Sequence, residues 1–248
     1  SLVSSGSAVI GWPLTSTGTS SVSVLSGAQL AINGGGLTSG NMSVSSSGTL
    51  SFNGTGKVFT VMNSAALRST GSVSISSGVV VVNSTSPAAW QVSAASVSGG
   101  NLTIAAPNIV DSNQTLAVSG SGLTYVKVPL TLATLSVDAG ATLSGTGASS
   151  PAAVTVKNAL VWNGGALSSI AVQANGPVTL SGSAKALQAA TLNTAGNVQW
   201  VGGPIAGSAG GLVRNTGVFT IAVSAPTDLS ASAPGACRLA NLGSIVKS

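Results

Sequence analysis

Histidine and glutamate are absent from this chain of 248 residues, and its only acidic side chains are those of Asp111, Asp138 and Asp228. Proton transfer, nucleophile activation and metal coordination depend mainly on His, Glu, Asp and Cys side chains. We therefore expect a protein that is not an enzyme and that holds neither a cofactor nor a metal ion. The same shortage removes most of the residues from which a ligand could be inferred.

Charged residues are also scarce, at 4% of the chain against about 25% in ordinary globular domains, and the mean hydropathy is +0.53. Disordered segments combine low hydropathy with high charge, which is the opposite composition. Polar or small residues interrupt every apolar stretch, so none reaches the roughly 18 to 20 residues of a membrane-spanning helix. The chain is predicted to fold and to contain no transmembrane segment.

The eight cations are scattered and give a formal net charge of +5 with a pI of about 10.0. Nucleic-acid-binding surfaces gather Lys and Arg beside aromatic side chains, and aromatic residues are only 3% of this chain. We expect no nucleic-acid partner. Cys237 is the single cysteine, so no disulfide can form within the chain, and we expect a half-buried, unreactive thiol.

Short alternating runs are the main structural signal, and sustained helical periodicity is missing. Val22-Ser-Val24, Leu102-Thr-Ile104 and Val154-Thr-Val156 are examples, and such runs end at Gly, Asn, Asp or Pro. This pattern predicts brief strands joined by tight corners.

The corners recur in three related motifs. The first two copies of the second motif are 20 residues apart, and Trp162 and Trp200 are 38 residues apart, about two turns of a coil of 19 residues. We expect these two indoles to pack in equivalent core or corner positions. The motifs are INGGGL at 32–37, VSGGNL at 97–102, WNGGAL at 162–167 and WVGGPI at 200–205; VLSGAQL at 24–30, VSSSGTL at 44–50, ISSGVVV at 75–81 and VDAGATL at 137–143; and NTAG at 193–196, NTG at 215–217 and NLG at 241–243.

A repeat of about 20 residues with Gly and Asn corners is typical of a β-solenoid. One coil of short strands cannot bury its inner face alone, whereas stacked coils satisfy one another's backbone groups and enclose a core. Like charges stacked about 4.8 Å apart would repel, which accounts for their scarcity. We predict one all-β domain over residues 1–248, a single-stranded right-handed parallel β-helix with about 20 residues per coil, the hand following the commoner case. A β-sandwich array is the alternative.

Residues 160–248 resemble the repeats of bacterial surface proteins with β-helical adhesin or autotransporter-passenger architecture. The resemblance implies an extracellular, cell-surface protein that acts as a stalk, adhesin or matrix component. It implies no functional residue, because the shared positions are corners and core. The segments that carry it are LVWNGGALSS at 160–169, VTLSGSAKAL at 178–187, LNTAGNVQWVGGPI at 192–205, VRNTGVFTI at 213–221 and LANLGSIVKS at 239–248, with LSVDAGATLSGTG at 135–147 as a weaker copy.

The first expected role is structural: a surface or fibre module, part of a longer extracellular protein, that stacks end to end through its open strand edges. A glycan- or ice-binding adhesin is the second, and Trp12 and Trp90 are its exposed aromatic candidates. An ice-binding face needs Thr-x-Thr in successive coils, but Thr15-Ser-Thr17 is isolated. A polysaccharide-active enzyme, with Asp111 and Asp138 in one groove, is the third.

Four cations at nearly equal intervals along the chain are further candidates for glycan binding: Lys127, Lys157, Lys185 and Arg214. On coils of about 29 residues they would form a basic ladder for an anionic polysaccharide, whereas on coils of about 20 residues they would rotate around the solenoid.

Overall fold

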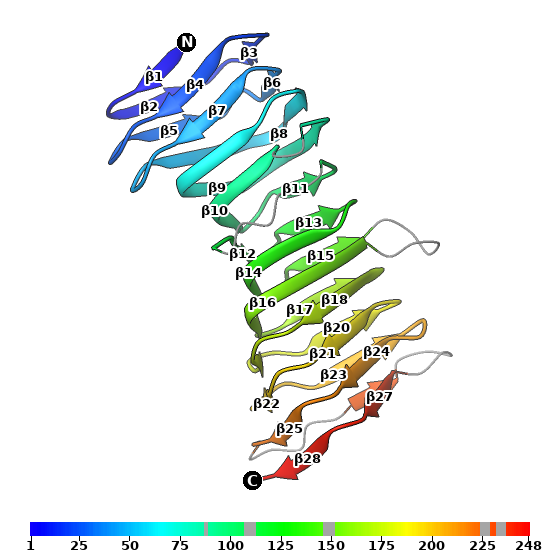
Figure 1. Ribbon diagram of the computed structural model, residues 1–248. Helices are drawn as coiled ribbons and strands as arrows, with labels where there is room; N and C mark the ends of the chain where they lie inside the picture. The colour runs from blue at the N-terminus through cyan, green and yellow to red at the C-terminus, as the bar shows by residue number, and fades with distance from the viewer. Residues whose placement is uncertain (87–88, 107–112, 146–151, 224–228, 232–236) are drawn as a thin grey trace.

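The described strands of the computed structural model pair in parallel with strands one turn before or after them, and the turns contain ~21 residues. The structure describes residues 1–86, 89–106, 113–145, 152–223, 229–231 and 237–248. No helix is present in these residues, so none there is long and apolar enough to span a membrane. The result is the elongated stack of Figure 1, which runs from the N-terminus at one end to the C-terminus at the other. The parallel β-solenoid predicted from the repeat is confirmed.

The strands form three faces, which we call A, B and C in the order in which the chain visits them. Face A contains β1 (Leu2–Ser4), β4 (Ser21–Val24), β7 (Asn41–Val44), the first parts of β9 (Leu67–Ser84), β10 (Trp90–Val97), β14 (Leu130–Val137) and β16 (Ala152–Trp162), then β18 (Ile170–Ala174), β21 (Thr191–Thr194), β24 (Leu212–Asn215) and β27 (Arg238–Asn241).

Faces B and C follow in each turn. Face B contains β2 (Ser7–Ile10), β5 (Gln29–Ile32), the first part of β8 (Thr49–Asn63), the middle of β9, the last parts of β10, β14 and β16, and β12 (Thr115–Val118), β19 (Val178–Leu180), β22 (Val198–Trp200), β25 (Val218–Ile221) and β28 (Ser244–Lys247). Face C contains β3 (Leu14–Ser16), β6 (Gly36–Thr38), the last parts of β8 and β9, β11 (Asn101–Ile104), β13 (Leu123–Val126), β15 (Thr142–Gly145), β17 (Gly165–Ser168), β20 (Lys185–Gln188), β23 (Ile205–Ser208) and β26 (Leu229–Ala231).

The core follows from the alternation of inward and outward side chains along most of the short strands. In β4, for example, Val22 and Val24 are buried while Ser21 and Ser23 are only half-buried, because successive side chains point to opposite sides of a strand. Val, Leu, Ile, Ala and the large aromatic residues fill the inner positions of most turns. Trp162 and Trp200 occupy the same inner row of face B, two turns apart with Leu180 between them, as their spacing predicted.

The number of residues per turn varies, and this number determines which residues of neighbouring turns are paired. Paired residues are 18 positions apart where Leu160 meets Val178, and 26 positions apart where Leu212 meets Arg238. The extra residues lie in corners, so the register within each face is preserved. One short corner, at 209–211, joins β23 to β24.

Candidate functional site

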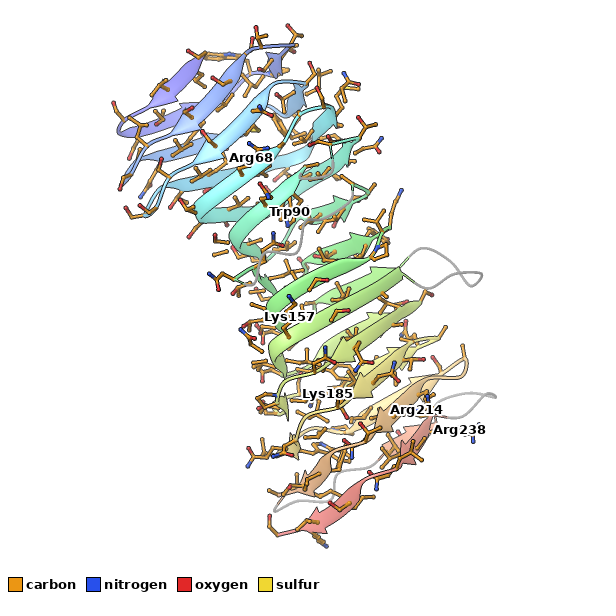
Figure 2. The ribbon with its side chains drawn as sticks, in the orientation of Figure 1. Arg68, Trp90, Lys157, Lys185, Arg214 and Arg238 are labelled. Carbon is orange, nitrogen blue, oxygen red and sulfur yellow. The ribbon has the colours of Figure 1, made fainter. Side chains whose placement is uncertain are left out.

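The four cations expected to form a ladder lie in four different places. Lys127 is exposed at the corner after β13, and Lys157 is exposed between the two parts of β16. Arg214 is exposed on face A, whereas Lys185 is buried at the start of β20; Figure 2 labels these last two residues and Lys157. The basic ladder that coils of about 29 residues would have formed does not occur, because a turn of ~21 residues is shorter than the interval between these cations, which therefore rotate around the stack.

Lys185 has an internal role that its sequence context does not reveal. Its side chain is 1% exposed, and its Nζ donates hydrogen bonds to the carbonyl oxygens of Ser183 at 3.0 Å and Gly202 at 2.9 Å. Gly165, its partner in the preceding turn, has no side chain to fill that inner position. Burial lowers the pKa of the ammonium group from 10.5 to about 8. Lys185 therefore ties two successive corners together and is not available as a surface cation.

The two tryptophans expected to be exposed differ. Trp12 is 71% exposed, as expected, but Trp90 is 2% exposed, so its assignment as an exposed sugar-stacking residue is wrong. Trp90 pairs with Leu67 and thereby continues an inner row of face A that also contains Met42. Its place in that row accounts for its burial.

Asp138 is the only acidic side chain in the described part of the chain, since Asp111 and Asp228 lie outside it. Its Oδ1 accepts hydrogen bonds from Asn163 Nδ2 at 2.8 Å and from Ser136 Oγ at 3.5 Å. Asn163 in turn accepts a hydrogen bond from Ser181 of the following turn. The Asp138 carboxylate thus joins a row of polar contacts between turns. No cluster of three metal-ligating residues occurs among the described residues.

The threonines considered for ice binding do not form a repeated array. Thr15 points outward on face C, and the next two positions of its row are Leu37 and Thr60. A flat ice-binding face would need the same residue in each turn. The alternation places an apolar side chain between the two hydroxyl groups.

A row of polar side chains on face A is the best candidate for a binding surface. Thr155, Gln173, Asn193 and Arg214 point outward from four successive turns, and we call this row the polar stripe. Neighbouring strands lie about 4.8 Å apart, so the four side chains form a continuous line. A surface hollow of about 250 Å³ lies along the stripe, lined by Gln173, Asn193, Thr194, Arg214 and Thr216.

The polar stripe retains unused hydrogen-bonding groups. Gln173 donates to Asn175 Oδ1 at 3.1 Å, and the Thr216 hydroxyl donates to the carbonyl oxygen of Thr194 at 3.2 Å. Within the described residues, neither the Asn193 amide nor the Arg214 guanidinium has a hydrogen-bond partner. A guanidinium presents paired donors suited to a carboxylate or sulfate group. The stripe can therefore donate to oxygen atoms of a ligand lying along it.

A second polar row runs inside the solenoid behind the stripe, and we call it the inner ladder. Thr194 Oγ1 donates to Asn215 Oδ1 at 2.8 Å, and Asn215 Nδ2 donates to Asn241 Oδ1 at 2.7 Å. Asn215 Nδ2 also bonds the carbonyl oxygen of Gly217 at 2.8 Å, and Asn241 Nδ2 bonds that of Gly243 at 2.7 Å. Each amide thus holds its own corner, and that of Asn215 also contacts the next turn.

The sequence motif that grouped Asn193 with Asn215 and Asn241 joined residues of two different rows. Thr194 is the inward partner of Asn215, while Asn193 is paired with Arg214 on the outside. A shift of one residue along a strand moves a side chain to the opposite side of the sheet. The motif therefore located both polar rows but could not separate them.

Comparison of the chain with models of known protein families, with curated protein sequences and with solved structures gives no match. What the geometry establishes is a parallel β-solenoid with an outer polar stripe and an inner ladder.

Proposed function

We propose that the chain is a non-enzymatic, extracellular structural and adhesive module: a stiff rod that holds surface-exposed groups at a fixed separation. The observation that carries this proposal is the continuous parallel pairing of the described strands of face B from β2 to β28. Bending such a stack would stretch hydrogen bonds along one face and open the shared core, so the rod resists bending. The resemblance of residues 160–248 to adhesin and autotransporter-passenger repeats supports a cell-surface location.

The stiffness can be tested with a fluorescent protein fused at each end of the chain. Single-molecule energy transfer is expected to give one narrow distance distribution that stays the same from low to about 1 M salt, because the rod is held by uncharged contacts. A Gly217→Ala variant is the control, since its Cβ would lie 2.5 Å from the Gly196 carbonyl oxygen and disturb the stacking. A broad or salt-dependent distribution in the unmodified chain would contradict the proposal.

A second function, binding of an anionic glycan, is favoured by the unpaired guanidinium of Arg214 beside the 250 Å³ hollow. A uronic acid carboxylate or a sugar sulfate would accept hydrogen bonds from Arg214 and Asn193, while the sugar rings extend along the polar stripe. Trp12 lies at the opposite end of the rod and is not part of this surface.

Affinity chromatography and calorimetry with polygalacturonate and dextran sulfate test this second function. Arg214→Gln is expected to weaken binding by about tenfold, the loss of one charge-assisted contact of about 1.4 kcal/mol. Arg68→Gln is the matched control, because Arg68 is also exposed on face A but lies far from the hollow (Figure 2). Equal binding by both variants would rule out the polar stripe as the site.

A further inference from the structure

One row of outward side chains on face C alternates between threonine and a large apolar or aromatic residue. From β6 to β13 the row contains one residue from each of five successive turns: Leu37, Thr60, Val81, Thr103 and Tyr125. We call these five residues the alternating row. Its apolar members are accessible, since Leu37 is 39% and Tyr125 is 37% exposed and Val81 is half-buried.

A second outward row lies two residues earlier in the last four of these turns and contains Val58, Val79, Asn101 and Leu123. Val58 is 51% exposed, and the other three side chains are half-buried. Asn101 belongs to the same turn as Thr103, whereas the turns before and after it present only apolar or aromatic side chains at these two positions. A polar band therefore lies between two apolar bands.

The face carries no outward charge over these turns. No Lys, Arg or Asp side chain points outward from the described segments of β6, β8, β9, β11 and β13 on face C, and Lys57 and Lys127 lie just outside those segments. The hydroxyl groups of Thr60 and Thr103 and the amide of Asn101 have no hydrogen-bond partner among the described residues. Face C can therefore donate and accept hydrogen bonds, but it offers no charge to pair with an ionic ligand.

We propose that the alternating row binds a neutral, extended β-linked polysaccharide that lies along the rod axis. A pyranose ring is apolar on the side where its axial C–H groups point and polar around its rim, where its hydroxyl groups lie. Apolar side chains can pack against the C–H groups, while Thr60, Thr103 and Asn101 hydrogen-bond to the rim. The inference rests on the proposed function, because it names a ligand for the adhesive module.

The repeat of the row matches the repeat of such a chain. Neighbouring turns lie about 4.8 Å apart, so the alternation of threonine with an apolar residue repeats every ~9.6 Å. In an extended β-linked chain each sugar residue covers nearly the same distance as one turn, and successive residues are turned over, so the chain also repeats at every second residue. Thr60 and Thr103, two turns apart, would therefore meet equivalent edges of two sugar residues.

The size of the surface favours a single glycan chain over a partner protein. Five turns about 4.8 Å apart, each contributing a strand of about four to six residues, give a face of roughly 300 Å². A stable contact between proteins covers about 800 Å² on each partner, which this face does not provide. A polysaccharide chain is only one sugar wide and makes its contact along the length of the row.

Calorimetry with cellohexaose, a neutral β-1,4-linked hexasaccharide, tests the proposal. Binding by the unmodified chain is expected to be the same at low salt and at about 0.5 M salt, because no charge is involved. Dextran, a neutral α-1,6-linked glucan without the extended repeat, should not bind. Tyr125→Ala removes the aromatic surface of the row and should weaken binding of cellohexaose about tenfold.

Two opposite exchanges test the alternation itself. Val81→Thr and Thr103→Val each break it, so each should weaken binding by about threefold, although the second makes the face more apolar. The matched controls are Val161→Thr and Thr179→Val, the same exchanges at paired, half-buried outward positions of face B, and they should leave binding unchanged. Both threonine and valine are β-branched, so the strands are retained, and thermal unfolding of each variant should confirm this.

Three results would overturn the proposal. The first is no heat of binding with cellohexaose. The second is tighter binding by Thr103→Val, or equal losses in the face B controls, which would indicate unspecific apolar adhesion. The third is self-association in sedimentation velocity that Val81→Thr abolishes, which would make face C a contact between copies of the chain.

These outcomes are distinct from failure of the proposed function. The stiffness measured by energy transfer does not involve the alternating row, and Arg214→Gln should leave the binding of cellohexaose unchanged. A chain that fails to bind cellohexaose but gives one narrow distance distribution would keep its role as a rod. A broad distribution would count against the rod, whatever the result with cellohexaose.

Discussion

Two buried threonines, Thr124 in the middle of the rod and Thr194 near its C-terminal end, have opposite surroundings. Thr124 on face C lies between Leu102 and Leu143, and its hydroxyl has no hydrogen-bond partner among the described residues. Thr194 on face A lies next to Asn215 and donates to its side chain at 2.8 Å. Both side chains are at most 1% exposed.

The difference shows when a solenoid interior accepts a polar residue. An inner side chain faces mainly the same position in the turns before and after it, so its hydrogen-bond partners are those two residues or a carbonyl oxygen of a nearby corner. A single polar residue in an apolar row loses its contacts with water and gains nothing, which costs about 1 to 3 kcal/mol. Polar residues at the same inner position of two or more successive turns can hydrogen-bond to one another, as Thr194, Asn215 and Asn241 do.

The largest effect is expected on breaking the inner ladder at its centre. Asn215→Ala removes the acceptor of Thr194 and the donors to Asn241 and Gly217, so it breaks three hydrogen bonds of the ladder at once. We expect a loss of about 3 kcal/mol in the free energy of unfolding, measured by urea denaturation. Asn193→Ala, one strand position before Thr194 but on the outer surface, should change it by less than about 0.5 kcal/mol. Equal losses would show that the ladder does not stabilise the rod.

The second effect concerns Lys185, a buried cation with two carbonyl partners and no counter-charge among the described residues. Its pKa of about 8 in the folded chain lies below the value of 10.5 in the unfolded chain. Between these two values the unfolded chain binds more protons, so the free energy of unfolding rises with pH, whereas below pH 8 the penalty is constant. We expect a rise of roughly 2 kcal/mol, less than the full shift would give, because the two carbonyl hydrogen bonds favour the charged form of the ammonium group.

The control for this prediction is a comparison of Lys185→Met with Lys157→Met, which replaces an exposed lysine. Urea titrations from about pH 7 to 11 should show the rise in the unmodified chain and in Lys157→Met but not in Lys185→Met. Burial raises the pKa of the Cys237 thiol, partly offset by the backbone N–H of Arg238, but this contribution is common to all three proteins and cancels in the comparison. A rise that persists in Lys185→Met would contradict the assignment.

The smallest effects bear directly on the pair of threonines. Thr124→Val keeps the side-chain volume and removes an unpaired hydroxyl, so it should stabilise the chain by about 1 kcal/mol. Thr194→Val removes a hydrogen-bonded hydroxyl and should destabilise it by about 1 kcal/mol. Thermal unfolding of the two variants should therefore shift in opposite directions. A shift of the same sign in both would refute the idea that neighbouring turns decide whether an inner polar residue is tolerated.

The sequence predicted the fold well because its signals are local. Alternation within short runs, Gly and Asn at corners, and the spacing of Trp162 and Trp200 all depend on short stretches of chain and indicated a solenoid. The site was predicted poorly. Trp90 and Lys185 were assigned to the surface, but both are buried, and Asn193 was not separated from the inner asparagines.

By itself, then, the sequence determined the all-β solenoid, the turn of about 20 residues and the apolar character of the inner rows, since each depends on residue type and short-range order. Only the tertiary structure decided which residue of one turn lies on which residue of the next. Corners differ in length, so partners lie between 18 and 26 positions apart, and a one-residue change reverses the direction of a side chain. The polar stripe, the inner ladder and the burial of Lys185 all follow from that register.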